Sequence, residues 1–525
     1  MQSEQQRALR NTIPDAIARA VRRSPGKTAI RFGDRAWTYR QLDEAAARVA
    51  GALAQWGLRP GDRVAAFGKN SDAYVLLWLA CLRSGLIHVP VNFSMTRAEA
   101  EYIVTQSGAS AIFADPALAD RVDGLPCKVS GTLHGGKVRD ILVAAAKGPV
   151  SPVSEALTDS TPAQILYTSG TTSAPKGAVL THRALLAEYV STIAACDIRA
   201  SDYSLAALPL YHSAQMHVFL MPLLLCGGTT LIADSPEAGY CLCTIHAEGI
   251  TSFFAPPTVW IALLRHADFD PERLGSLTKA YYGASIMPVP VLLELQQKLP
   301  ALRFYNCYGQ SEIGPLATVL GPDEHAGRPA SAGRPVLNVE TRIVDETMQD
   351  VPPGELGEIV HRSPQLLTEY WDKPEQTTEA FTGGWFHSGD LGYMDGEGYL
   401  YVVDRIKDVI NSGGVLVSSR EVEECLYTHG AVAEAAVFAL PHPKWVEAVA
   451  ACVVRKRGHE DAAEEELIAH ARQALAPFKV PKRIVFVADL PRNTAGKLLK
   501  RQLREDYAQL FGTQNKGLFP YGNRP

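Results

Sequence analysis

Helical and extended apolar segments alternate through residues 12–110, and this alternation limits the possible fold more than any other feature of the chain. One segment begins with the capping-box spacing Thr38-Tyr39-Arg40-Gln41. Apolar residues then recur at helical spacing, namely at Leu42, Ala45, Ala46, Val49, Leu53 and Trp56. An apolar strand at 64–67, a helix at 73–84 and a buried strand at 86–91 follow. Strands that alternate with helices in this way predict an α/β fold with largely parallel sheets.

The chain is too long for one hydrophobic core, because it has 525 residues. The alternation resumes between 163 and 298 and includes an expected helix at 213–226. Closely spaced turn signals at 335–405 indicate short antiparallel strands, and the chain from Asp404 onward has the pattern of a small α+β unit. We therefore predict a large domain at 1–404 and a small domain at 405–525, with a loose or docked tail at 512–525.

The composition argues against several classes of protein. A net charge of -5 is unfavourable for a dedicated nucleic-acid binder. The nine cysteines form neither a CxxC metal pair nor a disulfide framework, which favours a reducing setting. Residues 1–14 lack the apolar segment of a signal peptide, and the longest apolar stretches, 74–82 and 218–226, are too short to span a bilayer. We expect a cytoplasmic protein with no transmembrane segment and no nucleic-acid partner.

The stretch Tyr167–Gly177 combines hydroxyl side chains, glycines and one lysine directly after an apolar strand. Glycines allow successive backbone N–H groups to surround an anion, and a lysine adds a compact positive charge suited to phosphate. The stretch is not a Walker A loop, because Gly170 is followed by five residues before Lys176-Gly177. Taken alone, it could equally be a polar surface turn.

Further turns with polar groups follow apolar strands, which is where α/β sheets place ligand sites. Residues 304–312 end in an aromatic residue, a glycine and Glu312, whose carboxylate suits Mg²⁺. Residues 385–390 end in Asp390, which could chelate a ribose diol, and 490–497 end in Lys497. Each residue also has an ordinary structural interpretation, as a surface charge, a turn residue or a solvated lysine.

Together these segments resemble the adenylate-forming enzymes, a family that includes acyl-CoA synthetases, peptide-synthetase adenylation domains and luciferases. The resemblance extends from about residue 28 to 505 and keeps the family's order of motifs: YTSGTTSAPKGA, LPLYHSA, YYGAS, YGQSEIG, WFHSGDLG, YVVDRIKD and LPRNTAGK. The wording is most similar to the medium- and long-chain fatty-acyl-CoA synthetases of fatty acid metabolism. The resemblance implies stacked α/β sheets and a distorted β-barrel in the large domain, with a small mobile α+β domain after it.

The resemblance also implies ATP, Mg²⁺ and coenzyme A as reactants or cofactors, and it assigns residues to them. The β- and γ-phosphates would be held by Thr168, Ser169, Gly170, Thr171, Thr172 and Lys176. The adenine would lie between Tyr308 and the segment Gly283-Ala284-Ser285, next to Gly309, Gln310 and Ser311. Asp390 and Arg405 would bind the ribose, Glu312 would hold Mg²⁺, and Lys497 would join the carboxylate to the α-phosphate.

Two further positions take a role from the resemblance. Lys407 matches the hinge, near 404–407, about which the small domain rotates between half-reactions, although an ordinary linker lysine is the alternative. His212 matches a residue that lines the acyl and thiol tunnels and would act as a gate, although a packing histidine is the alternative.

The expected acyl pocket is apolar, with walls formed by Tyr211, Met216, Val259, Trp260, Ile286, Ile313 and Leu316. These stretches offer no arginine for a second carboxylate and no aspartate for an α-amino group. The expected substrate is therefore a fatty, cyclic or aromatic monocarboxylic acid.

The acceptor side departs from the wording of close relatives. Gly413 and Gly414 are kept, but Asn411, Val415 and Leu416 replace a lysine, a glutamate and an asparagine. We expect an acyl-CoA synthetase, while an amide synthetase with an amine acceptor, or loading of a carrier protein, stays open. A homodimer is a possible assembly.

Overall fold

The computed structural model describes residues 4–136, 138–168, 175–412, 415–442, 445–493 and 498–511. The chain divides into two compact units. The first holds the residues up to Ser388 together with Gly392–Val402, and the second holds Gly389–Leu391, Val403–Asn493 and the chain from Leu498. Rotation of the second unit about a hinge near 404–407 stays a prediction.

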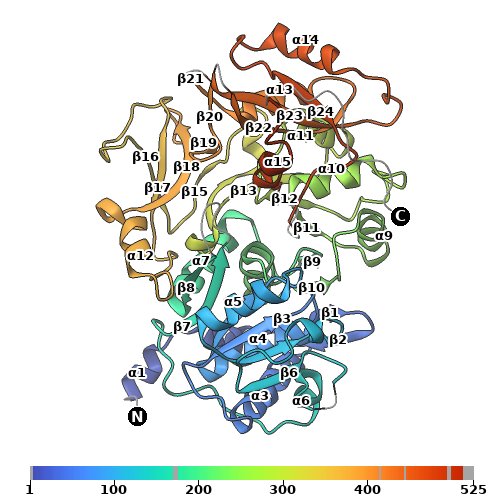
Figure 1. The fold of residues 1–525 in the computed structure, drawn as a ribbon. Helices are drawn as coiled ribbons and strands as arrows, with labels where there is room; N and C mark the ends of the chain where they lie inside the picture. Colours follow the sequence, from blue (N-terminus) through green and yellow to red (C-terminus); the bar gives the residue numbers. More distant parts are fainter. Residues whose placement is uncertain are drawn as a thin grey trace. The chain divides into compact units, whose positions relative to one another are not determined.

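A nine-stranded sheet forms the larger part of the first unit, with the strand order β15-β14-β13-β12-β11-β9-β10-β1-β2 (Figure 1). Its strands are β1 (Thr28–Phe32), β2 (Arg35–Thr38), β9 (Tyr203–Ala206), β10 (Thr229–Ile232), β11 (Ser252–Ala255), β12 (Lys279–Gly283), β13 (Arg303–Gly309), β14 (Leu316–Leu320) and β15 (Arg334–Pro335). The run from β1 through β10, β9, β11 and β12 to β13 is parallel, and antiparallel strands flank it at both edges.

A second sheet has six strands in the order β6-β5-β3-β4-β7-β8. Its strands are β3 (Arg63–Phe67), β4 (Ile87–Val91), β5 (Ala109–Ala114), β6 (Val129–Thr132), β7 (Pro162–Thr168) and β8 (Lys176–Thr181). All are parallel to their neighbours except β8, which returns antiparallel to β7. The alternation seen in the sequence therefore produced two largely parallel sheets, as predicted.

The helices of the first unit connect these strands. They are α1 (Glu4–Leu9), α2 (Ile13–Arg23), α3 (Tyr39–Gln55), α4 (Asp72–Ser84), α5 (Arg97–Ser107), α6 (Ile141–Lys147), α7 (His182–Ala195), α8 (Met221–Cys226), α9 (Ala238–Glu248), α10 (Pro257–Arg265), α11 (Val289–Lys298) and α12 (Pro374–Ala380). Short 3₁₀ turns are η1 (Pro116–Arg121), η3 (Ser311–Ile313), η4 (Pro322–Glu324) and η5 (Thr382–Gly384). The predicted capping box at Thr38 is present at the start of α3, where Thr38 Oγ1 accepts from the N–H of Gln41 at 3.3 Å.

One hydrophobic core joins the two sheets through the helices between them. Ile30 of β1 and Ile232 of β10 belong to the same buried cluster as Val64 and Ala66 of β3. Buried residues of α3, α4 and α7 complete this cluster. The first unit is therefore a stack of sheet, helices and sheet, which confirms the predicted fold class.

The predicted antiparallel region forms a four-stranded sheet in the order β16-β17-β18-β19. Its strands are β16 (Glu340–Val344), β17 (Gly357–Arg362), β18 (Phe386–Met394) and β19 (Leu400–Arg405).

The second unit is a small α+β fold built on the strand order β21-β20-β23-β22, with β24 parallel to β23. Its strands are β20 (Ile410–Ser412), β21 (Val415–Val417), β22 (Val432–His442), β23 (Val446–Arg455) and β24 (Arg483–Phe486). Its helices are α13 (Ser419–Tyr427), α14 (Glu464–Ala474) and α15 (Lys500–Asp506).

The segment expected to be one helix at 213–226 has an irregular first half. Residues Ala214–Leu220 (η2) form a π-helix, and α8 continues from Met221. The N–H of Met221 bonds the carbonyl of Met216, five residues back. Pro222 follows directly and has no N–H, so it cannot supply an α-helical bond to the preceding turn. Single π-turns of this kind are often found at functional sites.

Candidate functional site

The predicted phosphate loop connects the last two strands of the six-stranded sheet. Thr168 ends β7, Lys176 begins β8, and the two residues are partners in the antiparallel register. The predicted phosphate ligands Ser169, Gly170, Thr171 and Thr172 lie outside the described residues. The structure therefore fixes the two ends of the loop at one edge of the sheet.

Glu312 lies beside the loop although it is far away in the sequence. Its carboxylate oxygen Oε1 accepts hydrogen bonds from Thr168 Oγ1 at 3.1 Å and from the Tyr370 hydroxyl at 3.2 Å. The residue is only 9% exposed. Two residues that the sequence assigned separately, one to phosphate and one to Mg²⁺, are thus brought into direct contact.

Tyr370 was missing from the predicted site. The segment around it adds to the free edge of β8, because the N–H of Val179 donates to the Glu369 carbonyl at 2.9 Å and the N–H of Trp371 donates to the Gly177 carbonyl at 2.8 Å. This pairing places the Tyr370 ring 5.1 Å from Lys176 Nζ. Burial and the nearby Glu312 carboxylate raise the pKa of the Tyr370 hydroxyl, so it stays a neutral donor.

The two segments predicted to flank adenine end adjacent strands of the nine-stranded sheet. Gly283 of β12 pairs with Cys307 of β13, and a Cβ on Gly283 would lie 2.2 Å from the Cys307 carbonyl oxygen. A Cβ on Gly309 would lie 1.9 Å from the Pro315 carbonyl oxygen. Both positions therefore require glycine, because a side chain would clash with the neighbouring backbone.

The remaining residues of the adenine group lie around these glycines. Ala284 follows Gly283 with a positive φ of 64°, which directs the chain sharply away from the strand. Ala284 is exposed and Ser285 is half-buried. The half-buried Tyr308 packs against a small cluster that includes Ile343 and Ile359, and its ring lies 6.3 Å from the ring of His361.

A hydroxyl contact connects the start of the π-helix to the turn that carries Glu312. Ser213 Oγ and Ser311 Oγ are 3.0 Å apart. His212 precedes this contact, is half-buried, and donates its backbone N–H to the Pro209 carbonyl at 3.0 Å. Its role as a gate stays a prediction.

The acyl-wall candidates fall into two groups. Met216, Ile313 and Leu316 are buried on the side of α7 and η2, and Tyr211 packs edge-on against Phe93 with ring centres 5.6 Å apart. Val259 and Trp260 begin α10, where the Trp260 ring contacts the rings of Phe253 and Phe304.

Side chains alternate between the two faces of a strand, so these ring contacts show which face each group occupies. Phe253 contacts Trp260, whereas its neighbour Phe254 contacts Phe219 of η2. The structure therefore places Trp260 on the opposite face of the sheet from η2. Ile286 is 37% exposed. The acyl roles of all these residues stay predictions.

A buried polar clamp holds the segment between Glu312 and β14. The Glu188 carboxylate, on α7, accepts from Gln365 Nε2 at 2.7 Å and from the N–H of Leu316 at 3.3 Å. Gln365 Nε2 also donates to the Leu316 carbonyl at 2.9 Å. Burial raises the pKa of the Glu188 carboxyl, while the bonds from Thr192 and Leu316 act against that rise.

The second unit contains the predicted ribose ligands. Arg405 Nε lies 3.3 Å from Asp390 Oδ1, and the aspartate is buried. Lys407 is exposed in the turn that follows β19. The predicted acceptor residues Gly413 and Gly414 and the predicted catalytic residue Lys497 lie outside the described residues. Arg492 and Leu498, which precede and follow Lys497 in the sequence, pair as an antiparallel bridge.

Glu312 fits the predicted Mg²⁺ as a single oxygen ligand. Within the described part of the chain, no group of three or more His, Cys, Asp or Glu side chains is arranged to hold a metal ion. A cation at Glu312 would take its other ligands from phosphates and water, as Mg²⁺ commonly does.

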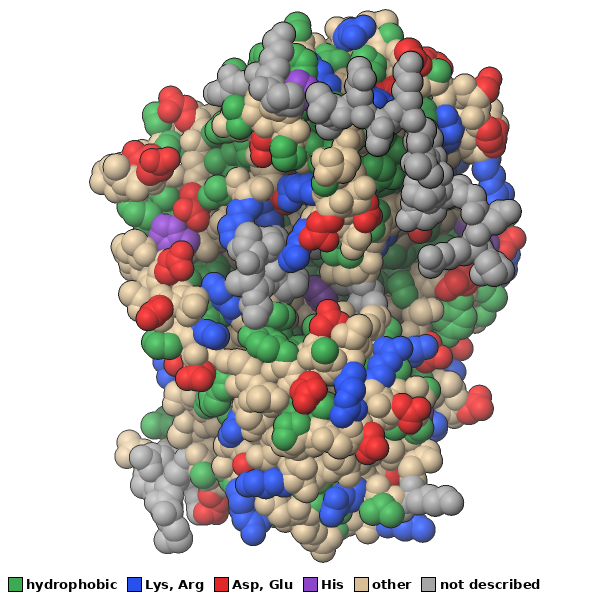
Figure 2. Space-filling view, in the orientation of Figure 1, with side chains coloured by type: hydrophobic (Ala, Val, Ile, Leu, Met, Phe, Trp, Pro, Cys, Tyr) green, Lys and Arg blue, Asp and Glu red, His purple; other side chains and the backbone are tan. Residues whose placement is uncertain are grey.

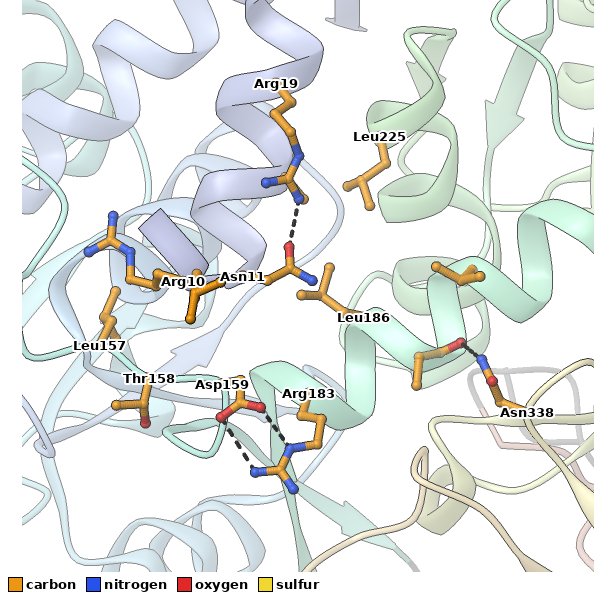
Figure 3. A pocket seen from close by; sticks show the side chains of 14 residues that line it. Arg10, Asn11, Arg19, Leu157, Thr158, Asp159, Arg183, Leu186, Leu225 and Asn338 are labelled. Atoms are coloured by element: carbon orange, nitrogen blue, oxygen red, sulfur yellow. Dashed lines mark hydrogen bonds and ion pairs between the residues drawn. The ribbon is translucent and has the colours of Figure 1, made fainter. Parts of the chain in front are cut away.

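A cavity of about 670 Å³ lies elsewhere in the first unit, between α2, α7 and α8 (Figure 3). Its floor is apolar, and its rim carries Arg183, which donates to Asp159, and Arg19, which donates to Asn11 at 2.7 Å. None of the residues assigned to the nucleotide or the acid lines it.

Acidic and basic side chains are interspersed over the face drawn in Figure 2. Among the described residues, no helix is long and apolar enough to span a bilayer.

Comparison with known protein families identifies the family of this chain. A profile of the AMP-binding enzymes matches residues 17–371, and a profile of the AMP-binding enzyme C-terminal domain matches residues 421–497. The chain belongs to the AMP-binding enzyme family. This membership confirms the assignment to adenylate-forming enzymes made from the motifs.

Relatives of this AMP-binding enzyme match it over nearly its whole length. A feruloyl-CoA synthase from an Amycolatopsis species is 37% identical over 489 residues, which cover 93% of this chain and 98% of the relative. The fatty acid–[acyl-carrier-protein] ligase ScoC from Streptomyces coeruleorubidus is 34% identical over 94% of this chain and 96% of the relative.

Solved structures agree with the fold. ATP-bound MatB from Rhodopseudomonas palustris has a TM-score of 0.87 at 30% identity, and the match covers 95% of this chain and 99% of that one. The amide bond synthetase McbA from Marinactinospora thermotolerans has a TM-score of 0.85 at 28% identity and covers 94% and 99%.

Proposed function

We propose that this AMP-binding enzyme activates an apolar monocarboxylic acid with ATP and transfers the acyl group to coenzyme A. It is an acid–thiol ligase that forms AMP. The observation that carries the assignment is the meeting of Thr168, Lys176, Glu312 and Tyr370 at one edge of the fold, in a chain that both family profiles match.

In the first half-reaction a carboxylate oxygen attacks the α-phosphorus of ATP, the bond from that phosphorus to the bridging oxygen breaks, and pyrophosphate leaves. Two anions must meet, so positive charge and N–H donors are needed. Lys176 would hold the β- and γ-phosphates together with the loop 169–172, and Lys497 would bridge the substrate carboxylate and the α-phosphate. Mg²⁺ bound at Glu312 would neutralise phosphate charge.

In the second half-reaction the thiol sulfur of coenzyme A attacks the acyl carbonyl, the thiol proton is lost to solvent or a base, and AMP leaves with the electron pair of the broken C–O bond. By resemblance, the second unit rotates about Lys407 between the two steps, with Asp390 and Arg405 on the ribose. His212 would gate the path of the thiol. The two half-reactions can be assayed separately in the variant Lys407→Pro. If the rotation is needed, this variant should impair one half-reaction far more than the other.

The acid is proposed to be aromatic or fatty. Met216, Ile313 and Leu316 are buried apolar side chains, and the feruloyl-CoA synthase, at 37% identity, is named for an aromatic acid. We further propose a cytoplasmic enzyme and leave a homodimer as a proposal for sizing by light scattering.

The test is carboxylate-dependent release of pyrophosphate from ATP by the whole enzyme. Wild-type protein should release pyrophosphate with at least one aromatic or fatty acid. Lys497→Ala should lower the rate by a factor of 100 or more, on the order of 3 kcal/mol of transition-state stabilisation, with ATP binding retained. The exposed Lys298→Ala is the control. Lys500→Ala is not suitable, because Lys500 Nζ is buried and lies 2.9 Å from the Glu423 carboxylate. Unchanged release by Lys497→Ala would refute the role of Lys497.

A second acceptor is favoured by one feature of the second unit. Leu416 pairs with Asn411 across the β20–β21 hairpin and is 67% exposed, and Val415 is 45% exposed. The resemblance implies polar residues at these positions, and exposed apolar side chains in their place would suit transfer to an amine or a carrier protein. The similarity to McbA and to ScoC keeps both alternatives open.

A further inference from the structure

The π-helix carries a buried amide oxygen without a hydrogen-bond partner. Gln215 is 1% exposed, and its Oε1 has no partner among the described residues. Buried polar atoms in folded proteins are nearly always bonded, so an unpartnered amide oxygen calls for a partner, and a bound ligand is one group that can supply it.

Ring contacts show which way this face of the π-helix points. Phe219 stacks on Phe254 of β11 with ring centres 4.4 Å apart and lies 4.9 Å from the ring of Tyr281 on β12. Residues four to five apart share one face of a π-helix, since its hydrogen bonds join residue i to i+5. Gln215 precedes Phe219 by four residues and therefore faces the nine-stranded sheet.

The opposite face of the same helix is already satisfied. His217 Nε2 lies 2.9 Å from Gln164 Oε1, and His217 Nδ1 lies 2.9 Å from the Tyr189 hydroxyl. The buried polar contacts of η2 thus go to β7 and α7. The Gln215 amide oxygen is left on the side of the nine-stranded sheet, whose strands β12 and β13 end in the predicted adenine segments.

The position of Gln215 along the helix places it near the carboxyl ends of the parallel strands, where α/β sheets place ligand sites. The chain leaves β9 at its carboxyl end and returns through η2 and α8 to the start of the parallel strand β10, so η2 begins at that edge. Gln215 therefore lies one turn nearer than Phe219 to the strand ends at Gly283 and Gly309. Helical side chains also lean toward the N-terminus, which brings the amide closer still.

We propose that Gln215 recognises a hydroxyl group on the acid, so that the preferred substrates are hydroxylated aromatic monocarboxylates. The hydroxyl would donate to Gln215 Oε1, while the ring packs on the apolar side chains beside it, Met216 among them. An amide is neutral, so it accepts this bond without attracting a second carboxylate or a cation. The inference rests on the proposed function, because it specifies the acid for the same site.

The experiment compares 3-phenylpropenoic acid with its 2-, 3- and 4-hydroxy and 4-methoxy derivatives, using the complete enzyme with ATP, Mg²⁺ and coenzyme A. We expect the best hydroxylated isomer to exceed the parent acid in kcat/KM by about tenfold or more, which converts to about 1.4 kcal/mol. Gln215→Met, which keeps the length of the side chain without its polar end, should bring the ratio of kcat/KM between the best hydroxylated isomer and the parent acid close to one. The exposed Gln297→Met on α11 is the matched control.

The outcomes separate this inference from the proposed function. If the parent acid is converted but no hydroxylated isomer is preferred by wild-type enzyme, the inference is wrong and the proposed function stands; this comparison needs no variant to fold. If the preference exists and persists in Gln215→Met, another group reads the hydroxyl and the inference is also wrong. If neither these acids nor fatty acids release pyrophosphate, the proposed function itself fails.

Discussion

Glu312 connects two separate segments of the candidate site, the end of β7 and the segment that contains Tyr370. Its carboxylate receives one hydroxyl from the end of β7 and one from Tyr370, which fixes the oxygen that would face a cation. A ligand held by two neighbouring donors is oriented before the metal arrives, and loss of such a supporting partner typically lowers metal affinity or activity by about 10- to 100-fold.

Replacing Tyr370 by phenylalanine removes one of these donors and little else. Hydrogen bonds to a charged group contribute about 1.5–3 kcal/mol, so we expect the rate of adenylate formation at limiting Mg²⁺ to fall by about tenfold or more. The concentration of Mg²⁺ needed for half-maximal velocity should rise, and saturating Mg²⁺ should restore much of the rate. Tyr240→Phe, at a residue 48% exposed on α9, is the control. A Mg²⁺ dependence identical to that of wild type would show that the Tyr370 hydroxyl does not orient Glu312.

Buried histidines give the stability of the first unit a defined pH dependence. Burial, with a smaller contribution from His88, lowers the pKa of His217 to about 3. Between the unfolded value near 6.5 and pH 3 the unfolded chain binds a proton that the native chain does not. The free energy of unfolding therefore falls as the pH falls through this window, by about 1.4 kcal/mol per pH unit for one histidine.

His217→Gln should remove that part of the slope. Urea unfolding of the variant and of wild type between pH 6.5 and 4.5 should give curves that converge toward low pH, because only the wild type gains the additional proton on unfolding. The exposed His459→Gln is the control for a change of histidine content alone. Parallel curves for His217→Gln and wild type would contradict the assignment of a neutral buried imidazole.

Among the elements, the strand before the phosphate loop and the helices that follow strands were predictable, whereas the return strand β8 and the segment that pairs with its free edge were not. Strand–turn–helix order is local information, and the capping box at Thr38 was visible as a spacing of residue types. Tyr370 reaches the site only because the segment that contains it pairs with β8. That pairing joins Val179 to Glu369, which are about 190 positions apart in the sequence. No local sequence pattern predicts a pairing over this distance.

The π-helix was missed for a different reason. Apolar residues at 213–226 predict a helix, but nearly all of them are buried, so their spacing does not distinguish an α-helical from a π-helical turn. Pro222 was the available signal, since it removes a backbone donor within the segment. The change from α-helical to π-helical geometry determines whether Gln215 or His217 faces the nine-stranded sheet.

The clamp of Glu188 is the element-scale feature with the clearest energetic consequence. Glu188→Ala would leave the buried N–H of Leu316 without its acceptor and would remove one of the acceptors of Gln365 Nε2, and a buried unpaired group costs about 1–3 kcal/mol. We expect unfolding of the first unit to be easier by about 2–4 kcal/mol, whereas Glu188→Gln, which keeps an acceptor oxygen, should cost less than half as much. Urea unfolding followed by tryptophan fluorescence measures both, with the exposed Glu272→Ala as control. Equal stability of Glu188→Ala and wild type would mean that the clamp is not needed to hold β14.

At the scale of the whole molecule, the order of weak motifs predicted the family, and the family profiles confirmed it at 17–371 and 421–497. The two stacked sheets follow from the helix–strand alternation. The acid and the acceptor could not be predicted in the same way, because the pocket walls come from separate elements and are ordinary apolar residues. Trp260 illustrates this, since its ring contacts Phe253 and Phe304 as any core side chain would, and its place in an acyl pocket stays a prediction.

The central claim is that the acyl-adenylate is made and then discharged by coenzyme A. The most direct measurement is mass spectrometry of the products when the enzyme is given ATP, Mg²⁺, one competent acid, coenzyme A and a panel of small amines together. The account predicts acyl-CoA and AMP in equal amounts, with amides absent or minor. Accumulation of an adenylate that coenzyme A does not discharge, or formation of an amide in its place, would contradict it.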